Sequence, residues 1–217
     1  MILKDAGMTH PKHAAADHEV LDLIRERWSP RAFDASRSVS FEDLWRLFEA
    51  ARWAPSSLNE QPWRFVVTHR DHSLEAYQRL FAALGATNQS WASTAPALIL
   101  TAVQLVVEFT GETNRHAYYD AGQAVAYLTL QAQSQGLGIR QMEGFDHAIA
   151  REVCQVPAGF EPAVVMAVGY PGSPDTLASD KHRAAEVAPR RRRKASEFVF
   201  DGTWGMSFTR KDSHEMG

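Results

Sequence analysis

Residues 51–65 of this 217-residue chain, ARWAPSSLNEQPWRF, mark the point where one regular element ends and the next begins. Pro55 interrupts a helical pattern of apolar residues, and Pro62 leads into a strand-like segment. Between the two prolines lie four uncharged hydrogen-bonding side chains, those of Ser56, Ser57, Asn59 and Gln61. Their donors and acceptors suit a flat polar heterocycle. They equally suit an ordinary helix-to-strand connection in which Ser and Asn cap local backbone groups.

The bulk composition is that of an ordinary globular protein. Hydrophobic residues make up 45% and charged residues 23% of the chain. The formal net charge of −3 argues against a general nucleic-acid binder. The single cysteine excludes an intrachain disulfide, and no window approaches the roughly 18 apolar residues of a membrane span. The composition therefore predicts a soluble, cytoplasmic protein that binds neither nucleic acid nor a membrane.

Hydrophobic periodicity predicts helices and strands that alternate along one domain. Helices are expected at residues 17–25, 40–54, 74–84 and 120–135, with Asp17 and Ser40 as N-caps, and a further helix is expected after Asp146. In the helix at 40–54, one apolar face is formed by Phe41, Leu44, Trp45, Phe48 and Ala51. Strands are expected at residues 65–68, 97–103, 139–142 and 162–170. Residues around Asn88, the excursion at 104–116 and residues 172–189 are expected to be irregular. This order favours a mixed α and β sandwich.

Two arginines flank a serine in the segment Arg27-Trp28-Ser29-Pro30-Arg31. In extended backbone, the period of two would send Arg27, Ser29 and Arg31 to the same side. Two guanidinium groups with a hydroxyl between them are what a phosphate or an electron-rich ring edge would recruit. Taken alone, however, the segment is better explained as a solvated basic turn.

A second basic cluster, RRRRK, occupies residues 190–194. Such runs most often form a solvated patch, a localisation signal or a nucleic-acid contact. The acidic balance of the rest of the chain weakens those interpretations, as does the strand-like segment Phe198-Val199-Phe200 that follows. A basic segment tied to the fold at its far end could instead close a phosphate pocket.

Four motifs in this order resemble those of the FMN-dependent nitroreductase family: RWSPRAF at 27–33, APSSLNEQPW at 54–63, GLGIRQMEGFD at 136–146 and the basic run near Arg190. The resemblance covers residues from about 20 to 199. It implies an α+β, three-layer sandwich with a mostly antiparallel central sheet flanked by helices. Residues 1–16 are polar and unpatterned, so a mobile N-terminal arm is expected there. The resemblance also implies an FMN-binding domain (17–200) and a C-terminal tail (201–217) that packs on the partner subunit, the arm from Phe198 onward being swapped in a homodimer.

The same resemblance implies that FMN binds at the subunit interface. The basic residues would hold its phosphate or approach the N1 and C2 carbonyl edge, and Asn88 would reach the pyrimidine edge. The turn after residue 141 would pass over the ring face. The chain departs from the family at Trp91, where relatives often carry a lysine. The residues implied to contact the cofactor are Arg27, Ser29, Arg31, Pro55, Ser56, Ser57, Asn59, Gln61, Asn88, Met142, Glu143, Gly144, Arg190 and Arg192.

In such a protein the flavin carries the chemistry, so no side chain is expected to act as a nucleophile or general base. The resemblance implies an NAD(P)H-dependent oxidoreductase of the nitroreductase type. NADPH or NADH would reduce the flavin, and a small-molecule electron acceptor such as a nitro compound or a quinone would then reoxidise it in a ping-pong cycle. The alternatives are a sister flavin reaction (dehalogenation, desaturation or flavin fragmentation) and a non-catalytic FMN-binding protein. Specificity is expected to lie in residues 104–119.

Overall fold

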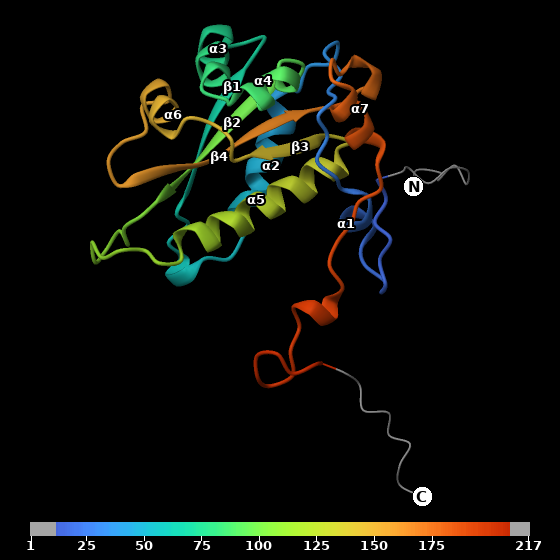
Figure 1. Cartoon of the computed structure of the whole chain (residues 1–217). Coiled ribbons are helices and arrows are strands. Elements are labelled where there is room, and N and C mark those ends of the chain that lie inside the picture. Colours follow the sequence, from blue (N-terminus) through green and yellow to red (C-terminus); the bar gives the residue numbers. More distant parts are fainter. Residues whose placement is uncertain (1–11, 209–217) are drawn as a thin grey trace, which may run out of the picture.

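The computed structural model describes residues 12–208, which fold around a four-stranded antiparallel sheet (Figure 1). The strands are β1 (Trp63–His69), β2 (Ala97–Gln104), β3 (Gly138–Met142) and β4 (Phe160–Gly169), arranged in the order β1-β2-β4-β3. All four strands expected from the sequence are therefore confirmed. β2 lies between β1 and β4 and is buried along nearly its whole length, because helices cover both faces of the sheet.

The helices form the two outer layers of the sandwich. On one face lie α2 (Phe41–Arg52) and α5 (Ala117–Ser134), and on the other lie α3 (Leu74–Ala82), α4 (Ala86–Ala92) and α6 (His147–Val153). The alternation of side chains along β2 serves both layers, since Leu98 and Leu100 join one core cluster and Ile99 and Val103 the other. The α+β, three-layer architecture expected from the sequence is confirmed. Within residues 12–208, no helix combines the length and the apolar character needed to cross a membrane.

The start of α2 follows the capping rule. The Ser40 side chain accepts a hydrogen bond from the backbone N–H of Asp43 at 3.0 Å and donates to its carboxylate at 2.7 Å. The helix ends at Arg52, ahead of Pro55. Its buried face consists of Leu44, Leu47 and Ala51, whereas the Trp45 side chain, which the apolar period placed on that face, is 70% exposed.

The shorter helices differ from expectation. The helix expected at residues 17–25 is limited to α1 (Asp22–Glu26), and its N-cap residue is Leu21, which provides no side-chain cap, rather than Asp17. The segment around Asn88 is not irregular but forms α4, which Gly85 precedes as the N-cap residue. The expected loop at 172–189 contains α7 (Asp180–Val187), capped by Ser179, and the short 3₁₀ turn η2 (Pro174–Thr176). A helix of seven or eight residues with few buried positions leaves little periodic signal in the sequence.

The C-terminal segment, which is expected to add a strand to a partner subunit, joins none of the four strands within residues 12–208. After the 3₁₀ turn η3 (Ala195–Glu197), residues 198–200 form no strand, and only a single bridge joins Phe200 to Ser207. Figure 1 shows this segment leaving the body of the molecule. The expected domain boundaries stay predictions, and residues 1–11 and 209–217 lie outside the described part of the chain.

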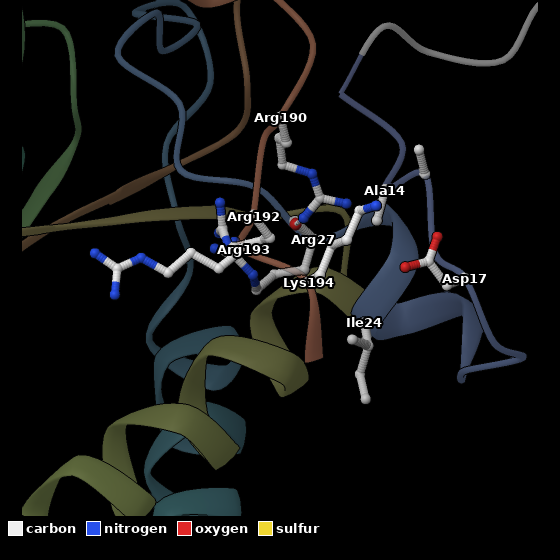
Figure 2. Close-up of a pocket in the computed structure, with 9 residues that line it drawn as sticks. Ala14, Asp17, Ile24, Arg27, Arg190, Arg192, Arg193 and Lys194 are labelled. Atoms are coloured by element: carbon white, nitrogen blue, oxygen red, sulfur yellow. Dashed lines mark hydrogen bonds between the residues drawn. The ribbon is translucent and has the colours of Figure 1, made fainter. Parts of the chain in front are cut away.

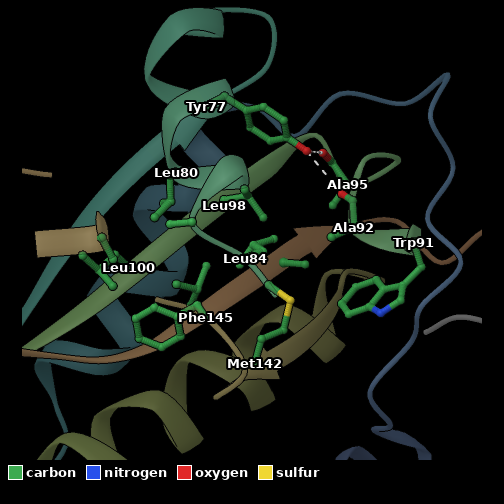
Figure 3. Close-up of a cluster of buried hydrophobic side chains, with 14 of the residues drawn as sticks. Tyr77, Leu80, Leu84, Trp91, Ala92, Ala95, Leu98, Leu100, Met142 and Phe145 are labelled. Carbon is green, nitrogen blue, oxygen red and sulfur yellow. Dashed lines mark hydrogen bonds between the residues drawn. The ribbon is translucent and has the colours of Figure 1, made fainter. Parts of the chain in front are cut away.

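One core cluster holds the end of α4 against the sheet (Figure 3). The hydroxyl of Tyr77 on α3 donates to the carbonyl oxygens of Ala95 at 2.9 Å and Ala92 at 3.2 Å. Trp91 and Met142 belong to the same cluster, so the end of α4 and the end of β3 pack side by side. This packing fixes the two elements that border the candidate site.

Candidate functional site

A basic cavity of about 470 Å³ lies between the segment around α1 and the C-terminal basic run (Figure 2). Arg27 follows α1 directly, and the other basic side chains come from residues 190–194. The residues lining the cavity are Ala14, Ala15, Asp17, Ile24, Arg27, Arg190, Arg192, Arg193 and Lys194. Arg27, Arg190 and Arg192, which the family resemblance placed in one site, are thus brought together by the fold.

Arg190 anchors the basic run to the segment that follows α1. Its guanidinium group donates to the carbonyl oxygens of Arg25 and Arg27, although more than 160 residues separate these segments in the chain. Arg27 in turn donates to the hydroxyl of Ser29 at 3.2 Å. The two basic motifs therefore form a single structural unit.

The cations of this unit crowd one another. Burial, followed by the nearby guanidinium groups of Arg190 and Arg192, lowers the pKa of Arg27. Burial and Arg192 likewise lower the pKa of Arg190, whose buried Nε has no hydrogen-bond partner among residues 12–208. A dianionic group such as a phosphate would relieve this repulsion and use the remaining donors. The donor set therefore fits a phosphate.

A half-buried arginine extends the site from Ser29 towards α4. Arg140 lies in the middle of β3, and its guanidinium group donates to the carbonyl oxygen of Ser29 at 2.8 Å. The same guanidinium lies 5.4 Å from the centroid of the Trp91 ring. Burial, followed by the charge of Arg31, lowers the pKa of Arg140 to about 10. No lysine stands at the position of Trp91, and the guanidinium group of Arg140 reaches this ring from the sheet.

The turn after β3 is held against α4. Asn88 donates through its side-chain amide to the carbonyl oxygen of Gly144 at 2.9 Å, and the N–H of Gly85 donates to the same oxygen at 2.9 Å. Asn88 lies one helical turn before Trp91. The Met142 side chain points into the core (Figure 3), so only its backbone is available to a ligand. Ser29, Arg140 and Trp91 thus form one line of contacts, and the pair of Asn88 and Gly144 lies one helical turn before Trp91.

Close backbone packing brings the first basic motif to this line. A Cβ atom added to Gly138 at the start of β3 would lie 2.5 Å from Cγ of Pro30. Only glycine allows this approach, so the RWSPR segment lies directly against the strand that carries Arg140. The motif containing Gly138 therefore has a packing role as well as the expected site role.

The polar loop of the central motif lies elsewhere in the chain. It forms the 3₁₀ turn η1 (Ser57–Asn59), and the N–H of Ser57 donates to the Asp120 carboxylate at 2.9 Å. Leu58, Asn59 and Gln61 have positive φ angles of 52°, 57° and 46°. Such strain in residues other than glycine is concentrated at functional sites.

This loop and the basic cavity lie at opposite ends of α5 (Figure 1). Asp120 is in the first turn of the helix, and 18 residues at 1.5 Å each make α5 about 27 Å long. A single chain therefore does not bring Pro55, Ser56, Ser57, Asn59 and Gln61 to the cavity. The assignment of all fourteen residues to a cofactor stays a prediction.

Sequence reasoning missed three residues that organise the site. Asp120 holds the polar loop, Arg140 links Ser29 to Trp91, and the buried Glu186 accepts hydrogen bonds from the backbone N–H groups of Arg31 and Ala32. An arginine inside an apolar strand was a visible signal for Arg140. The carboxylates of Asp120 and Glu186 accept hydrogen bonds from residues more than 60 positions away in the chain, so no local sequence pattern indicates them.

The fold and the site define a three-layer α+β protein with a phosphate-compatible basic cavity beside the end of the sheet. A family model described as the nitroreductase family matches residues 24–170, more than half of the chain. The chain therefore belongs to the nitroreductase family. Both the fold class and the resemblance expected from the motifs are confirmed.

Individual relatives differ in how much of the chain they match. A solved structure described as an oxidoreductase containing FMN is 28% identical, with a TM-score of 0.84, and covers 93% of this chain and 100% of its own. The major NAD(P)H-flavin oxidoreductase of Aliivibrio fischeri is 34% identical to this chain over a matched region of 88 residues. That region is 41% of this chain and only 40% of the relative's length. Iodotyrosine deiodinase from Thermotoga neapolitana is 26% identical over 70% of this chain and 89% of its own length.

Proposed function

We propose that this protein binds FMN and uses NADPH or NADH to reduce small acceptors such as nitro compounds or quinones. The observation that carries the proposal is the junction of the two basic motifs, in which Arg190 is bonded to the backbone of Arg27 and Arg27 to Ser29. The FMN-containing relative of matching length and the flavin oxidoreductase relative support this cofactor and reductant.

The residues present fit FMN at both of its polar ends. Arg27, Arg190 and Arg192 would hold the phosphate, since their crowded guanidinium groups favour a dianion. Asn88 and the turn at Gly144 would face the polar edge of the ring system. The bound flavin supplies the hydride-transfer chemistry, so the chain's own residues bind it, orient it and exclude water. Arg31 would favour the reduced ring by placing a positive charge beside it.

We further propose that a second copy of the chain completes the site. The polar loop 55–61 is separated from the basic cavity of its own chain by the length of α5. In a homodimer, the loop of one subunit can meet the cavity of the other. The strained backbone of this loop, anchored on the buried Asp120, keeps its polar groups in one fixed arrangement.

The C-terminal arm supports the same assembly. Its large apolar side chains are exposed, with Trp204 89% exposed, and the arm joins no strand of the sheet among residues 12–208. The outer side of β1 is an open sheet edge, beside an apolar groove of about 410 Å³ between α2 and β1. Open edges and exposed aromatic grooves are usually covered. We assign the groove to residues 198–208 of the partner.

A dehalogenating flavin reaction is the second candidate, because the iodotyrosine deiodinase relative matches 70% of the chain. The two reactions need the same FMN site and differ in the acceptor. Turnover of iodotyrosine with release of iodide, in the absence of nitroarene turnover, would favour the second candidate.

We place the protein in the cytoplasm, which its single cysteine supports.

An anaerobic titration tests the proposed function. The purified protein is loaded with FMN, and its visible spectrum is followed as NADPH and NADH are added separately. We expect the flavin band to bleach and to return when a nitroarene or a quinone is added. Flavin that stays oxidised with both nucleotides would contradict the proposed reductant, and a chain that takes up no FMN would overturn the proposal.

A further inference from the structure

Glu186, in the last turn of α7, is a buried carboxylate with an unusual environment. It is 2% exposed, and its Oε1 accepts hydrogen bonds from the backbone N–H groups of Arg31 at 2.8 Å and Ala32 at 3.0 Å. Its Oε2 is also buried but has no hydrogen-bond partner within residues 12–208. A buried carboxylate normally needs partners for both oxygens. The two backbone contacts therefore do not fully explain a charged side chain at this position.

Basic side chains from three segments lie close to this carboxylate. Lys12 donates to the carbonyl oxygens of Ala185 and Ala188 at 2.6 Å each, on either side of Glu186 in the chain. His182 lies one helical turn before it on α7. Arg140 approaches from β3 through the carbonyl of Ser29, two residues before Arg31.

The electrostatic environment agrees with this placement. Burial lowers the pKa of Lys12, His182 and Arg140, and neighbouring arginines lower it further, whereas the charge of Glu186 acts in the opposite direction on all three. Glu186 therefore supplies the negative charge inside a group of cations. Removing it would increase the positive potential along the line from Arg31 to Trp91.

We propose that Glu186 is a positioning residue that sets how easily the bound flavin is reduced, acting through Arg31 and Arg140. This inference rests on the proposed function. Glu186 fixes the backbone of Arg31 and offsets the positive charge that Arg31 and Arg140 direct towards the site. Reduced flavin carries more negative charge than oxidised flavin, so cations favour the reduced form and Glu186 limits that preference.

Glu186→Gln separates the charge from the backbone contacts, because the amide oxygen can still accept from both N–H groups. We expect the variant to bind reduced FMN more tightly relative to oxidised FMN, by about tenfold. For a two-electron couple this corresponds to a rise of about 30 mV in the midpoint potential. Arg140→Gln should change the potential in the opposite direction, and Arg140→Lys should restore it.

The experiment measures the midpoint potential of bound FMN anaerobically against a reference dye, with FMN content and Tm recorded for each variant. Glu152→Gln, on the exposed surface of α6, is the matched control and should leave the potential unchanged. Glu186→Asp keeps the charge, so its potential should stay near that of the wild type.

The outcomes separate this inference from the proposed function. A rise with Glu186→Gln and a fall with Arg140→Gln support the inference. Full FMN content with an unchanged potential in Glu186→Gln overturns it and leaves the flavin site intact, because Glu186 is then only a backbone anchor. Should Glu186→Gln fail to fold, Arg140→Gln tests the proposed action through Arg140. An unchanged midpoint potential in that variant overturns the inference, and a lower one supports it. A wild-type chain that binds no FMN overturns both proposals.

Discussion

The backbone N–H of Ser57 donates to the Asp120 carboxylate at 2.9 Å, and this contact ties the strained loop 55–61 to the first turn of α5. Asp120 is buried, so its carboxylate is removed from water. Hydrogen bonds from protein groups, such as this one from Ser57, offset the cost of that desolvation. Gln61 closes the same loop by donating its N–H to the hydroxyl of Ser56 at 3.0 Å. The conformation of the loop therefore depends on a residue outside it.

Asp120→Ala is expected to destabilise the protein by about 1–3 kcal/mol, because it leaves a partly buried N–H without its acceptor. FMN binding should weaken as well, since the loop loses its fixed backbone. Asp120→Asn retains an acceptor oxygen and serves as the control. Urea unfolding and FMN fluorescence titration measure the two effects. Equal FMN affinity in the two variants would show that the loop does not contribute to the cofactor site.

Tyr77 gives a pH-dependent test of the core beside α4. Burial raises the pKa of Tyr77 to about 12, against 10.0 for an ordinary tyrosine. The folded state therefore favours the neutral phenol, so this contribution to stability is complete below pH 10 and is lost as the pH rises towards 12. Tyr77→Phe should lose about 1 kcal/mol at neutral pH. Its unfolding free energy should also fall less steeply between pH 10 and 12, and parallel pH profiles in urea unfolding would contradict the assigned burial.

Much of the fold is encoded in local patterns. Four apolar or alternating segments predict the four strands, and the Ser40 cap predicts the start of α2. Short helices such as α4 and α7 escape prediction because each has at most two buried side chains, so their apolar period is weak. Trp45 was assigned to the buried face because periodicity identifies an apolar side of a helix without showing what covers it.

The candidate site was predictable only in its separate pieces. The basic motifs were visible, but the bonds from Arg190 to residues near α1 span more than 160 positions, and only the resemblance placed the motifs together. Glu186 and Arg31 are 155 positions apart. Such contacts depend on the path of the chain between them, which a reading of local spacing does not determine.

Trp45 tests the proposed assembly, because it lines the groove at the open edge of β1. Trp45→Ser removes apolar surface that the partner's arm would cover. We therefore expect the dissociation constant of the dimer to rise at least tenfold. Fully burying an aromatic side chain contributes roughly 2–3 kcal/mol. Trp53→Ser, another exposed tryptophan outside this groove, is the control. Sedimentation equilibrium measures both, and identical dissociation constants would contradict the assigned groove.

Arg192 and Arg191 form a matched pair for testing the phosphate site. Both are arginines in the same run, but only Arg192 lines the basic cavity. Arg192→Ala should weaken FMN binding by about tenfold or more, because a charge-assisted hydrogen bond contributes roughly 1.5–3 kcal/mol. Arg191→Ala should bind FMN nearly as the wild type does. FMN fluorescence titrations at low and high ionic strength measure the difference, which should shrink as salt screens the charges. Equal losses in the two variants would mean that the run acts as a diffuse patch, and a loss confined to Arg191→Ala would shift the phosphate contacts by one residue.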